Sequence, residues 1–156
     1  MENFTDKFEC SAKYGFYVFS SPIYYPFSFL RHCWIVTVCD GKINRIEVWN
    51  FKNKKNIELG YIHKNLIPSI RGVRKFNFKK YPKFESSLVG CVVGGSGSLA
   101  ESMVNFVNFD NIDYIFKNNY NYFFKPNCNT FVSWVLNQFP DCNINLPKNA
   151  IGKLKY

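Results

Sequence analysis

The sequence lacks any long apolar run. No uninterrupted stretch approaches the roughly 20 apolar residues that a helix needs to cross a bilayer. The first residues also lack the basic and apolar regions of an ordinary secretory signal. Of the 156 residues, 47% are nonetheless hydrophobic and 19% aromatic, which excludes the polar composition of a disordered chain. We therefore expect one soluble globular domain over residues 1–156, cytoplasmic unless another export route carries it.

Metal-binding motifs are absent as well. The chain has two histidines and six scattered cysteines, with no Cys-x-x-Cys pair and no spacing typical of zinc sites. We expect no metal and no cofactor. A chain of this size without a secretory signal does not need disulfides, so we expect reduced thiols, although an even number also permits three disulfides. The glycine-rich segment 94–98 lacks a following Lys-Ser/Thr pair, which favours a turn over a phosphate-binding loop.

Acidic residues are outnumbered, with 11 Asp and Glu against 20 Lys and Arg and a net charge of +9. Such a balance is common in nucleic-acid-binding proteins. The lysines are, however, spread through a background rich in Asn, Phe, Tyr and Ile, so we do not expect nucleic-acid binding; a steep salt dependence of DNA or RNA retention would indicate it. The densest basic stretch, from Arg71 to Lys83, fits a solvated loop or edge strand, or else a site for a phosphate or an acidic partner.

The clearest structural signal is a β-hairpin. Two β-type runs, His32–Cys39 and Lys42–Trp49, flank an Asp-Gly pair at 40–41, which is typical of a two-residue type I′ turn. With Cys39 facing Lys42, a histidine and a carboxylate become diagonal neighbours on one side of the ribbon. The side chains that share this side are His32, Trp34, Arg45, Glu47 and Trp49.

Other patterns predict further strands and helices. One run, at 86–93, is apolar enough for the interior of a sheet. The predicted strands are Phe16–Phe19, Leu59–His63, Phe76–Tyr81 and Ser86–Val93, and helices are predicted from Leu99, over Asp110–Lys117 and from Cys128.

A thiol stands at the start of the last predicted helix. Pro126 fixes the chain, Asn127 is a helix-capping residue type, and apolar residues recur at four-residue spacing after Cys128. Unpaired N–H groups and the helix dipole favour a thiolate there, and such amides can stabilise an oxyanion. A reactive cysteine needs such a place, although a cysteine that only packs under the helix gives the same pattern.

A histidine and a carboxylate complete a candidate catalytic set. In thiol catalysis the thiolate attacks a carbonyl, an imidazole exchanges the proton, and a polar residue orients the imidazole. His32 is the candidate base, and Glu47 the candidate orienting residue, because the register places both on one side. Asn50 is the weaker choice, since it points to the opposite face unless a bulge shifts the strand. We interpret His63, among polar and turn-prone neighbours, as a surface or structural residue.

Five motifs occur in order along most of the chain: Arg31–Val36, Arg45–Trp49, Gly60–Tyr61, Pro126–Val132 and Leu146–Lys153. Together they resemble an uncharacterised bacterial family of the circularly permuted NlpC-type superfamily of papain-like cysteine peptidases. The resemblance implies a papain-like α+β fold, with an antiparallel sheet packed against the helix that starts at the nucleophile. It also implies Cys128 as nucleophile, His32 as base and Glu47 as the third member.

The sequence thus predicts a cysteine-dependent hydrolase or acyltransferase acting on an amide, peptide or acyl-ester bond. Its substrate, whether peptide, glycopeptide or acyl compound, is left open, as is the oligomeric state. Members of the resembled family often carry Ser in place of Cys128, and the thiol retained here favours an enzyme. The alternative is a non-catalytic binding module that keeps the papain-like fold. Tyr24, Tyr25 and Phe27 would either line its cleft or pack the N-terminal loop.

Overall fold

Five strands and two α-helices form the regular structure of the described residues, which are 12–75, 83–108 and 112–154 of a computed structural model. The strands are β1 (Tyr14–Pro22), β2 (Arg31–Cys39), β3 (Lys42–Val48), β4 (Ile62–Lys64) and β5 (Ser87–Gly94). The α-helices are α1 (Leu99–Asn108) and α2 (Cys128–Asn137), and short 3-10 helices cover Ile57–Leu59 and Pro140–Cys142. The fold class is therefore α+β, as predicted.

The strands form one antiparallel sheet in the order β4-β3-β2-β1-β5. β2 and β3 are the predicted hairpin, and pairs from Cys39 opposite Lys42 to Ile35 opposite Ile46 confirm its register. The turn residues at 40–41 have φ angles of 47° and 77°, both positive as a type I′ turn requires. The start of β2 and the end of β3 therefore lie at the same end of the sheet, away from the turn.

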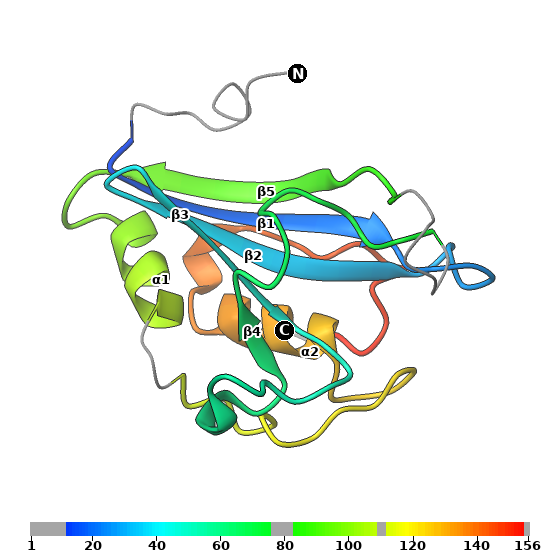
Figure 1. The fold of residues 1–156 in the computed structure, drawn as a ribbon. Helices are drawn as coiled ribbons and strands as arrows, with labels where there is room; N and C mark the ends of the chain where they lie inside the picture. Colours follow the sequence, from blue (N-terminus) through cyan, green and yellow to red (C-terminus); the bar gives the residue numbers. More distant parts are fainter. Residues whose placement is uncertain (1–11, 76–82, 109–111, 155–156) are drawn as a thin grey trace.

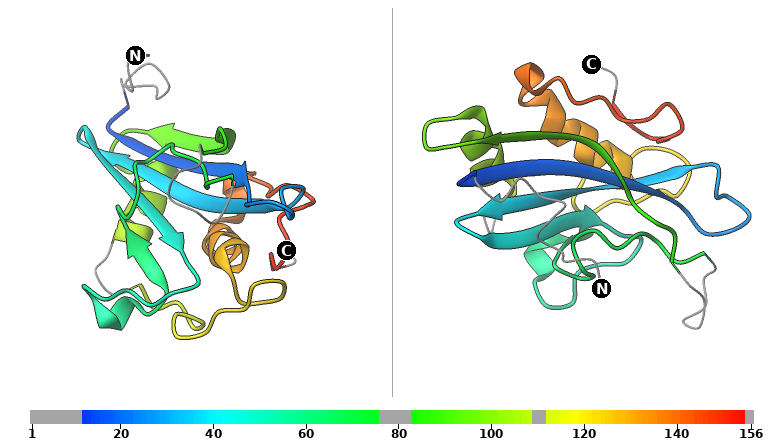
Figure 2. Two further views of the ribbon diagram at one scale, coloured as in Figure 1. Left: turned by 45° about the vertical axis from the view of Figure 1, so that its right-hand side comes forward. Right: turned by 90° about the horizontal axis from the view of Figure 1, so that it is seen from above.

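Both α-helices cover one face of the sheet (Figures 1 and 2). α1 packs against β1 and β5, and α2 against β2 and β3. The main hydrophobic core fills the space between these two layers, and its fully buried members include Phe16, Ile35, Val104 and Phe131. Because side chains alternate along a strand, the even-numbered residues of β2 face away from the helices. They include His32, which stands at the end of the sheet, beside the start of α2.

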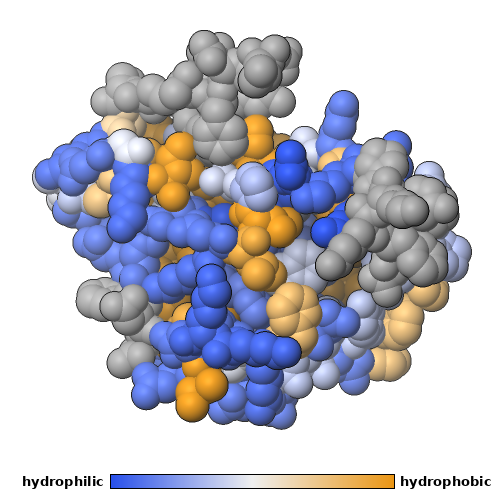
Figure 3. Space-filling model, in the orientation of Figure 1, coloured by the Kyte–Doolittle hydropathy of each residue, from blue (hydrophilic) through white to orange (hydrophobic). Residues whose placement is uncertain are grey.

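The opposite face of the sheet has a smaller apolar cluster of Tyr17, Phe19, Trp34 and Val36. The loop after β4 covers part of it: the Trp34 indole Nε1 donates to the Ser69 carbonyl at 2.8 Å. Hydrophilic residues dominate the coloured part of the face shown in Figure 3, and hydrophobic residues show there in separate patches. Within the described ranges, no helix has both the length and the apolarity to cross a membrane.

Several strand and helix predictions are confirmed, with changed bounds. The predicted strand at 16–19 lies within the longer β1, the short strand at 59–63 appears as β4, and the helices from Leu99 and Cys128 are present. The run at 86–93 forms β5, but at an edge of the sheet, with Leu88 50% exposed. The prediction of a sheet interior is wrong there, because in the described structure β5 pairs only with β1.

The predicted helix over 110–117 is wrong where the structure describes it. Residues 112–114 are irregular and 115–118 form a turn. Ile112 and Tyr114 are buried, whereas Ile115 is 70% exposed. The Tyr114 ring packs against Phe131 and Trp134 of α2. Tertiary packing has overridden the local pattern. The predicted strand at 76–81 lies outside the described residues.

Candidate active site

The helix α2 begins at Cys128 and is capped by Asn127. The Asn127 Oδ1 accepts hydrogen bonds from the backbone amides of Asn129 and Thr130 at 2.9 and 3.2 Å. In return, the Thr130 Oγ1 accepts one from the Asn127 amide at 3.0 Å, which completes a capping box. The cap occupies both of these first-turn amides. Of the helix-start amides that could stabilise an oxyanion, those of Asn129 and Thr130 are therefore already hydrogen-bonded.

The Asn129 side chain ties the start of α2 to β2. Its Oδ1 accepts from the Cys33 amide at 3.1 Å, and its Nδ2 donates to the Arg31 carbonyl at 2.9 Å. These are the two chain neighbours of His32. The same Nδ2 also donates to the Ile151 carbonyl at 2.8 Å. Asn129 therefore fixes the backbone on both sides of His32 relative to the helix that carries Cys128.

The C-terminal segment packs against the same helix start. The Asn127 Nδ2 donates to the Ile151 carbonyl at 3.2 Å, and the Thr130 Oγ1 donates to the Gly152 carbonyl at 2.6 Å. Gly152 has a φ of 82°, and a Cβ atom there would collide with the Asn127 amide, so the close approach requires glycine. We call Asn127, Asn129 and Thr130 the asparagine clamp.

His32 is held by Glu47. The His32 Nε2 lies 3.0 Å from the Glu47 Oε2, and the imidazole packs against the rings of Trp34 and Trp49 at centroid distances of 5.8 and 5.0 Å. His32 is 5% exposed, so its ring has little freedom to turn. With Nε2 directed at the carboxylate, Nδ1 is the ring nitrogen left to exchange a proton with another group.

Arg45 anchors Glu47 from the other side. Its Nη2 donates to the Glu47 Oε2 at 2.7 Å, and its Nη1 donates to the carbonyls of Pro68 and Arg71 at 3.0 and 2.6 Å. The guanidinium carbon lies 4.1 Å from the centre of the Trp34 ring, a cation–π contact. Arg45 and Glu47 are both fully buried. We call His32, Glu47 and Arg45 the charged relay.

The charges of the relay support one another. Burial raises the pKa of Glu47, but the hydrogen bond from His32 and the charge of Arg45 outweigh it and lower that pKa overall. Burial lowers the pKa of His32, whereas Cys128, and then Glu47, raise it to about 9. At neutral pH the relay therefore holds a carboxylate beside a charged imidazolium.

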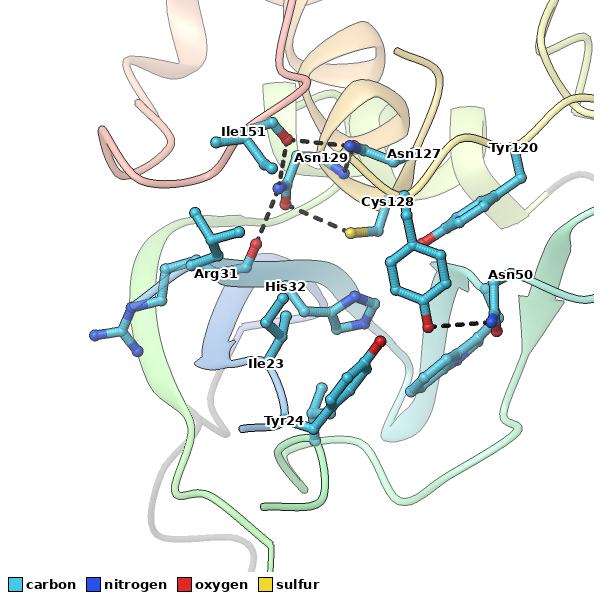
Figure 4. A pocket seen from close by; sticks show the side chains of 14 residues that line it. Ile23, Tyr24, Arg31, His32, Asn50, Tyr120, Asn127, Cys128, Asn129 and Ile151 are labelled. Atoms are coloured by element: carbon cyan, nitrogen blue, oxygen red, sulfur yellow. Dashed lines mark hydrogen bonds between the residues drawn. The ribbon is translucent and has the colours of Figure 1, made fainter. Parts of the chain in front are cut away.

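Cys128 and His32 line one small pocket of about 60 Å³. Figure 4 shows the Cys128 sulfur and the His32 ring turned toward each other across it. Of the groups that raise the pKa of His32, Cys128 has the largest effect. The thiol also lies 3.6 Å from the Asn129 Oδ1. The structure thus brings Cys128, His32 and Glu47 together.

Three tyrosines surround the rest of the pocket: Tyr24, Tyr120 and Tyr122. The Tyr122 hydroxyl accepts a hydrogen bond from the Asn50 Nδ2 at 3.1 Å. Asn50 therefore contacts Tyr122, and Glu47 is the residue that contacts His32. Burial raises the pKa values of Tyr120 and Tyr122, so both hydroxyls stay protonated near neutral pH and can donate hydrogen bonds.

The remaining predicted residues have mainly structural contacts. The His63 Nε2 lies 2.9 Å from the Phe51 carbonyl and His63 is 5% exposed, so it is a buried structural residue and not a surface one. Of the N-terminal aromatics, Tyr24 lines the pocket, whereas Tyr25 and Phe27 pack against other aromatic rings. Both interpretations of that segment hold in part.

The other thiols differ from Cys128 in environment. Cys33 is fully buried, and that burial raises its pKa, whereas Cys91 is exposed. No disulfide joins the five cysteines within the described ranges; Cys10 lies outside them. In the same part of the chain, no group of three or more His, Cys, Asp and Glu side chains could hold a metal ion.

Sequence reasoning missed three contributors to this site. The register placed Arg45 beside Glu47 but did not show its anchoring to two loop carbonyls. The polar residues around Cys128 in the Pro-Asn-Cys-Asn-Thr motif were a signal for the asparagine clamp, because polar side chains in a first helical turn often bond to backbone groups. No sequence pattern indicated Tyr120 and Tyr122, because they lie in an irregular loop without periodicity.

Comparisons with known proteins gave one match. A protein-family model described as "Protein of unknown function (DUF3750)" matches residues 14–156. No curated protein and no solved structure matched the chain. The match covers nearly the whole chain, including Cys128, the charged relay and the asparagine clamp.

Proposed function

We propose that this chain, which belongs to the DUF3750 family, is a papain-like cysteine hydrolase or acyltransferase. The observation that carries the proposal is a single pocket in which a thiol at a helix start faces an imidazole held by a buried carboxylate. Substrates with an amide, peptide or acyl-ester bond fit this chemistry. The order of His32 before Cys128 in the chain agrees with a permuted papain-like arrangement.

The reaction would begin with the Cys128 thiolate. Its sulfur attacks the substrate carbonyl carbon, a C–S bond forms, and the carbonyl π electrons move to oxygen. When the carbonyl re-forms, the bond to the leaving nitrogen or oxygen breaks, and that atom takes the proton from the His32 Nδ1. The products of this half-reaction are a thioester on Cys128 and a neutral His32.

The second half-reaction returns the site to its starting state. A water molecule, or an acceptor alcohol or amine, transfers a proton to the His32 Nδ1 as it attacks the thioester. The sulfur then leaves as thiolate, and an imidazolium stands beside Glu47 again. The Cys128 backbone N–H is the first-turn amide left for the oxyanion, because the cap occupies the next two.

Alkylation rates test this proposal. Cys91 is exposed and Cys128 is only 7% exposed, so labelling that follows access alone would reach Cys91 first. We expect iodoacetamide to label Cys128 before Cys91 at pH 7, as followed by peptide mass spectrometry, because His32 stabilises the thiolate. His32→Ala should slow Cys128 labelling at least tenfold and leave the Cys91 rate unchanged, which makes Cys91 an internal control.

Turnover provides a second readout. Hydrolysis of 4-nitrophenyl acetate should disappear in Cys128→Ala and fall about 10²- to 10⁴-fold in His32→Ala, the usual contribution of general acid–base catalysis. Labelling of Cys128 no faster than that of Cys91, together with no effect of His32→Ala, would reject the enzyme. The binding-module interpretation would then replace it.

A further inference from the structure

The pocket at Cys128 is too small to hold a whole substrate, and a larger groove adjoins it. The pocket encloses about 60 Å³, enough for a few atoms around a scissile bond. The neighbouring groove encloses about 500 Å³, within the range of small-molecule binding sites. Tyr24, Trp49, Asn50, Val73 and Tyr122 line both. A substrate that reaches Cys128 would therefore place its bulk in this groove.

Most of the groove wall is apolar or aromatic. Four aromatic side chains contribute to it, and the aliphatic part comes from the segment after β4. The residues of these two kinds are Tyr24, Trp49, Phe51 and Tyr122, and Leu66, Ile67 and Val73. Phe51 and Leu66 are 46% and 44% exposed, so apolar surface stays open to solvent for a ligand to cover.

Two cationic side chains, those of Arg74 and Lys83, also line the groove. Arg74 and Lys83 pair across an isolated antiparallel bridge, and paired residues carry their side chains on the same face. No Asp or Glu is among the lining residues, and the ion pairs of the described chain include neither cation. Burial and the neighbouring charges of Arg71 and Arg74 lower the pKa of Lys83. An anion placed there would reduce the repulsion between these positive charges.

We infer that the substrate joins an apolar or aromatic group, which fills the groove, to a carboxylate that pairs with Arg74 and Lys83. This inference rests on the proposed function, since it takes the acyl carbon to lie at Cys128. It assigns the basic bridge at Arg74 and Lys83 the role of recognising an acidic group. A peptide ending and a free N-acyl amino acid share this chemistry.

A binding experiment on Cys128→Ala separates recognition from catalysis. The probes are dansyl-phenylalanine, which carries an aromatic group and a carboxylate, and dansyl-phenylalaninamide, which lacks the charge. We expect the acid to bind more tightly than the amide by about two- to fivefold for each cation it meets, the range of exposed ion pairs. That preference should shrink as salt is raised from 0.05 to 0.5 M, because salt screens exposed charges.

Matched variants locate the preference. In the Cys128→Ala background, Arg74→Gln and Lys83→Gln should each weaken binding of the acid about two- to fivefold and leave the amide unchanged. Lys42→Gln removes the same charge at the hairpin turn, away from the groove, and should change neither affinity. A loss of acid binding in Lys42→Gln equal to that in Arg74→Gln would show a general charge effect and overturn the inference.

Substrates for the intact thiol distinguish the two ligand sources and the two proposals. The N-acyl-Phe-Glu and N-acyl-Phe-Gln 4-nitroanilides share one leaving group and differ only in the acidic side chain of a peptide substrate, whereas N-acyl-phenylalanine carries the carboxylate of a free amino acid. Faster release of 4-nitroaniline from the Glu than from the Gln peptide favours a peptide source, and faster hydrolysis of N-acyl-phenylalanine than of its amide favours a free N-acyl amino acid. Equal affinity of the two dansyl probes overturns the groove assignment even where 4-nitrophenyl acetate is hydrolysed through Cys128, which leaves the proposed function standing.

Discussion

The asparagine clamp and the charged relay hold the two halves of the candidate site by different means. The clamp uses neutral side chains, and each of its three residues bonds to backbone groups of the helix start, β2 or the C-terminal segment. The relay uses two fully buried charged side chains that contact each other, and one of them, Glu47, also contacts His32. The clamp fixes where Cys128 and His32 lie, whereas the Glu47 carboxylate of the relay acts together with Cys128 to raise the pKa of His32.

The two networks also differ in how completely their atoms are paired. Arg45 Nε and Glu47 Oε1 are buried without a hydrogen-bond partner among the described residues, whereas the clamp has no such atom in the same ranges. A buried polar atom left unpaired costs about 1–3 kcal/mol. The relay therefore maintains the charge state at some expense of stability, and the clamp stabilises the fold. Variants of the relay should therefore change the His32 pKa as well as the free energy of unfolding, whereas variants of the clamp should change the free energy of unfolding alone.

Arg45→Met should have the largest effect on stability. It breaks the buried ion pair between Arg45 and Glu47 and leaves His32 as the one cation in contact with that carboxylate among the described residues, and breaking a buried ion pair typically costs about 3–5 kcal/mol. Urea unfolding followed by tryptophan fluorescence measures the loss. The double variant Arg45→Met/Glu47→Gln removes both charges and should recover most of it. Equal losses in the single and double variants would mean that the packing of Arg45 on Trp34, and not its charge, matters.

Sequence reasoning could place the relay because its parts are local. The Asp-Gly turn sets the hairpin register, and the register alone puts His32, Arg45 and Glu47 on one side. The helix start at Cys128 is equally local, since a capping residue and an apolar period define it. The hairpin register and the helix start both depend on contacts between residues that are close along the chain or joined by a tight turn.

The charge on His32 gives the next prediction. Its pKa of about 9 lies above the ordinary value of about 6.5. Charged His32 therefore contributes stability that is fully present below pH 6.5 and is lost as the pH rises through 9. The contribution is about 3 kcal/mol at most, from the size of the shift. Proton NMR of the imidazole measures the pKa, and His63→Gln assigns the signal because the chain has two histidines.

Two variants identify the source of this shift. Cys128→Ala should lower the His32 pKa most, since Cys128 is the strongest of the groups that raise it, and Glu47→Gln should lower it less. A pKa of His32 that stays near 9 in Cys128→Ala would show that the thiol does not ionise beside the imidazole. Acid catalysis by His32 should likewise decline above pH 9, as the imidazolium loses its proton.

The features that sequence missed depend on contacts between distant segments. The C-terminal residues 151 and 152 bond to Asn127, Asn129 and Thr130 of the helix start, and the motif Leu146–Lys153 that contains them does not show which segment they contact. Tyr114 sits in a segment of helical pattern, and packing against Phe131 holds it in a loop. Neither hydrophobic periodicity nor residue type shows which distant segments contact each other. The pocket wall and the adjoining groove therefore could not be predicted from the sequence.

Asn127→Ala should have a smaller effect than Arg45→Met or the variants that change the His32 pKa. Its effect should be on the free energy of unfolding alone. The variant loses the helix cap, which is worth about 1 kcal/mol, or about 2–4 °C in Tm for a domain of this size. Asn127→Ser keeps an oxygen that can accept from the first-turn amides and should lose less. Because Asn127 carries no charge, the His32 pKa should stay near 9 in both variants. An imidazole pKa that falls in Asn127→Ala as far as in Glu47→Gln would mean that the clamp and the relay act as one network.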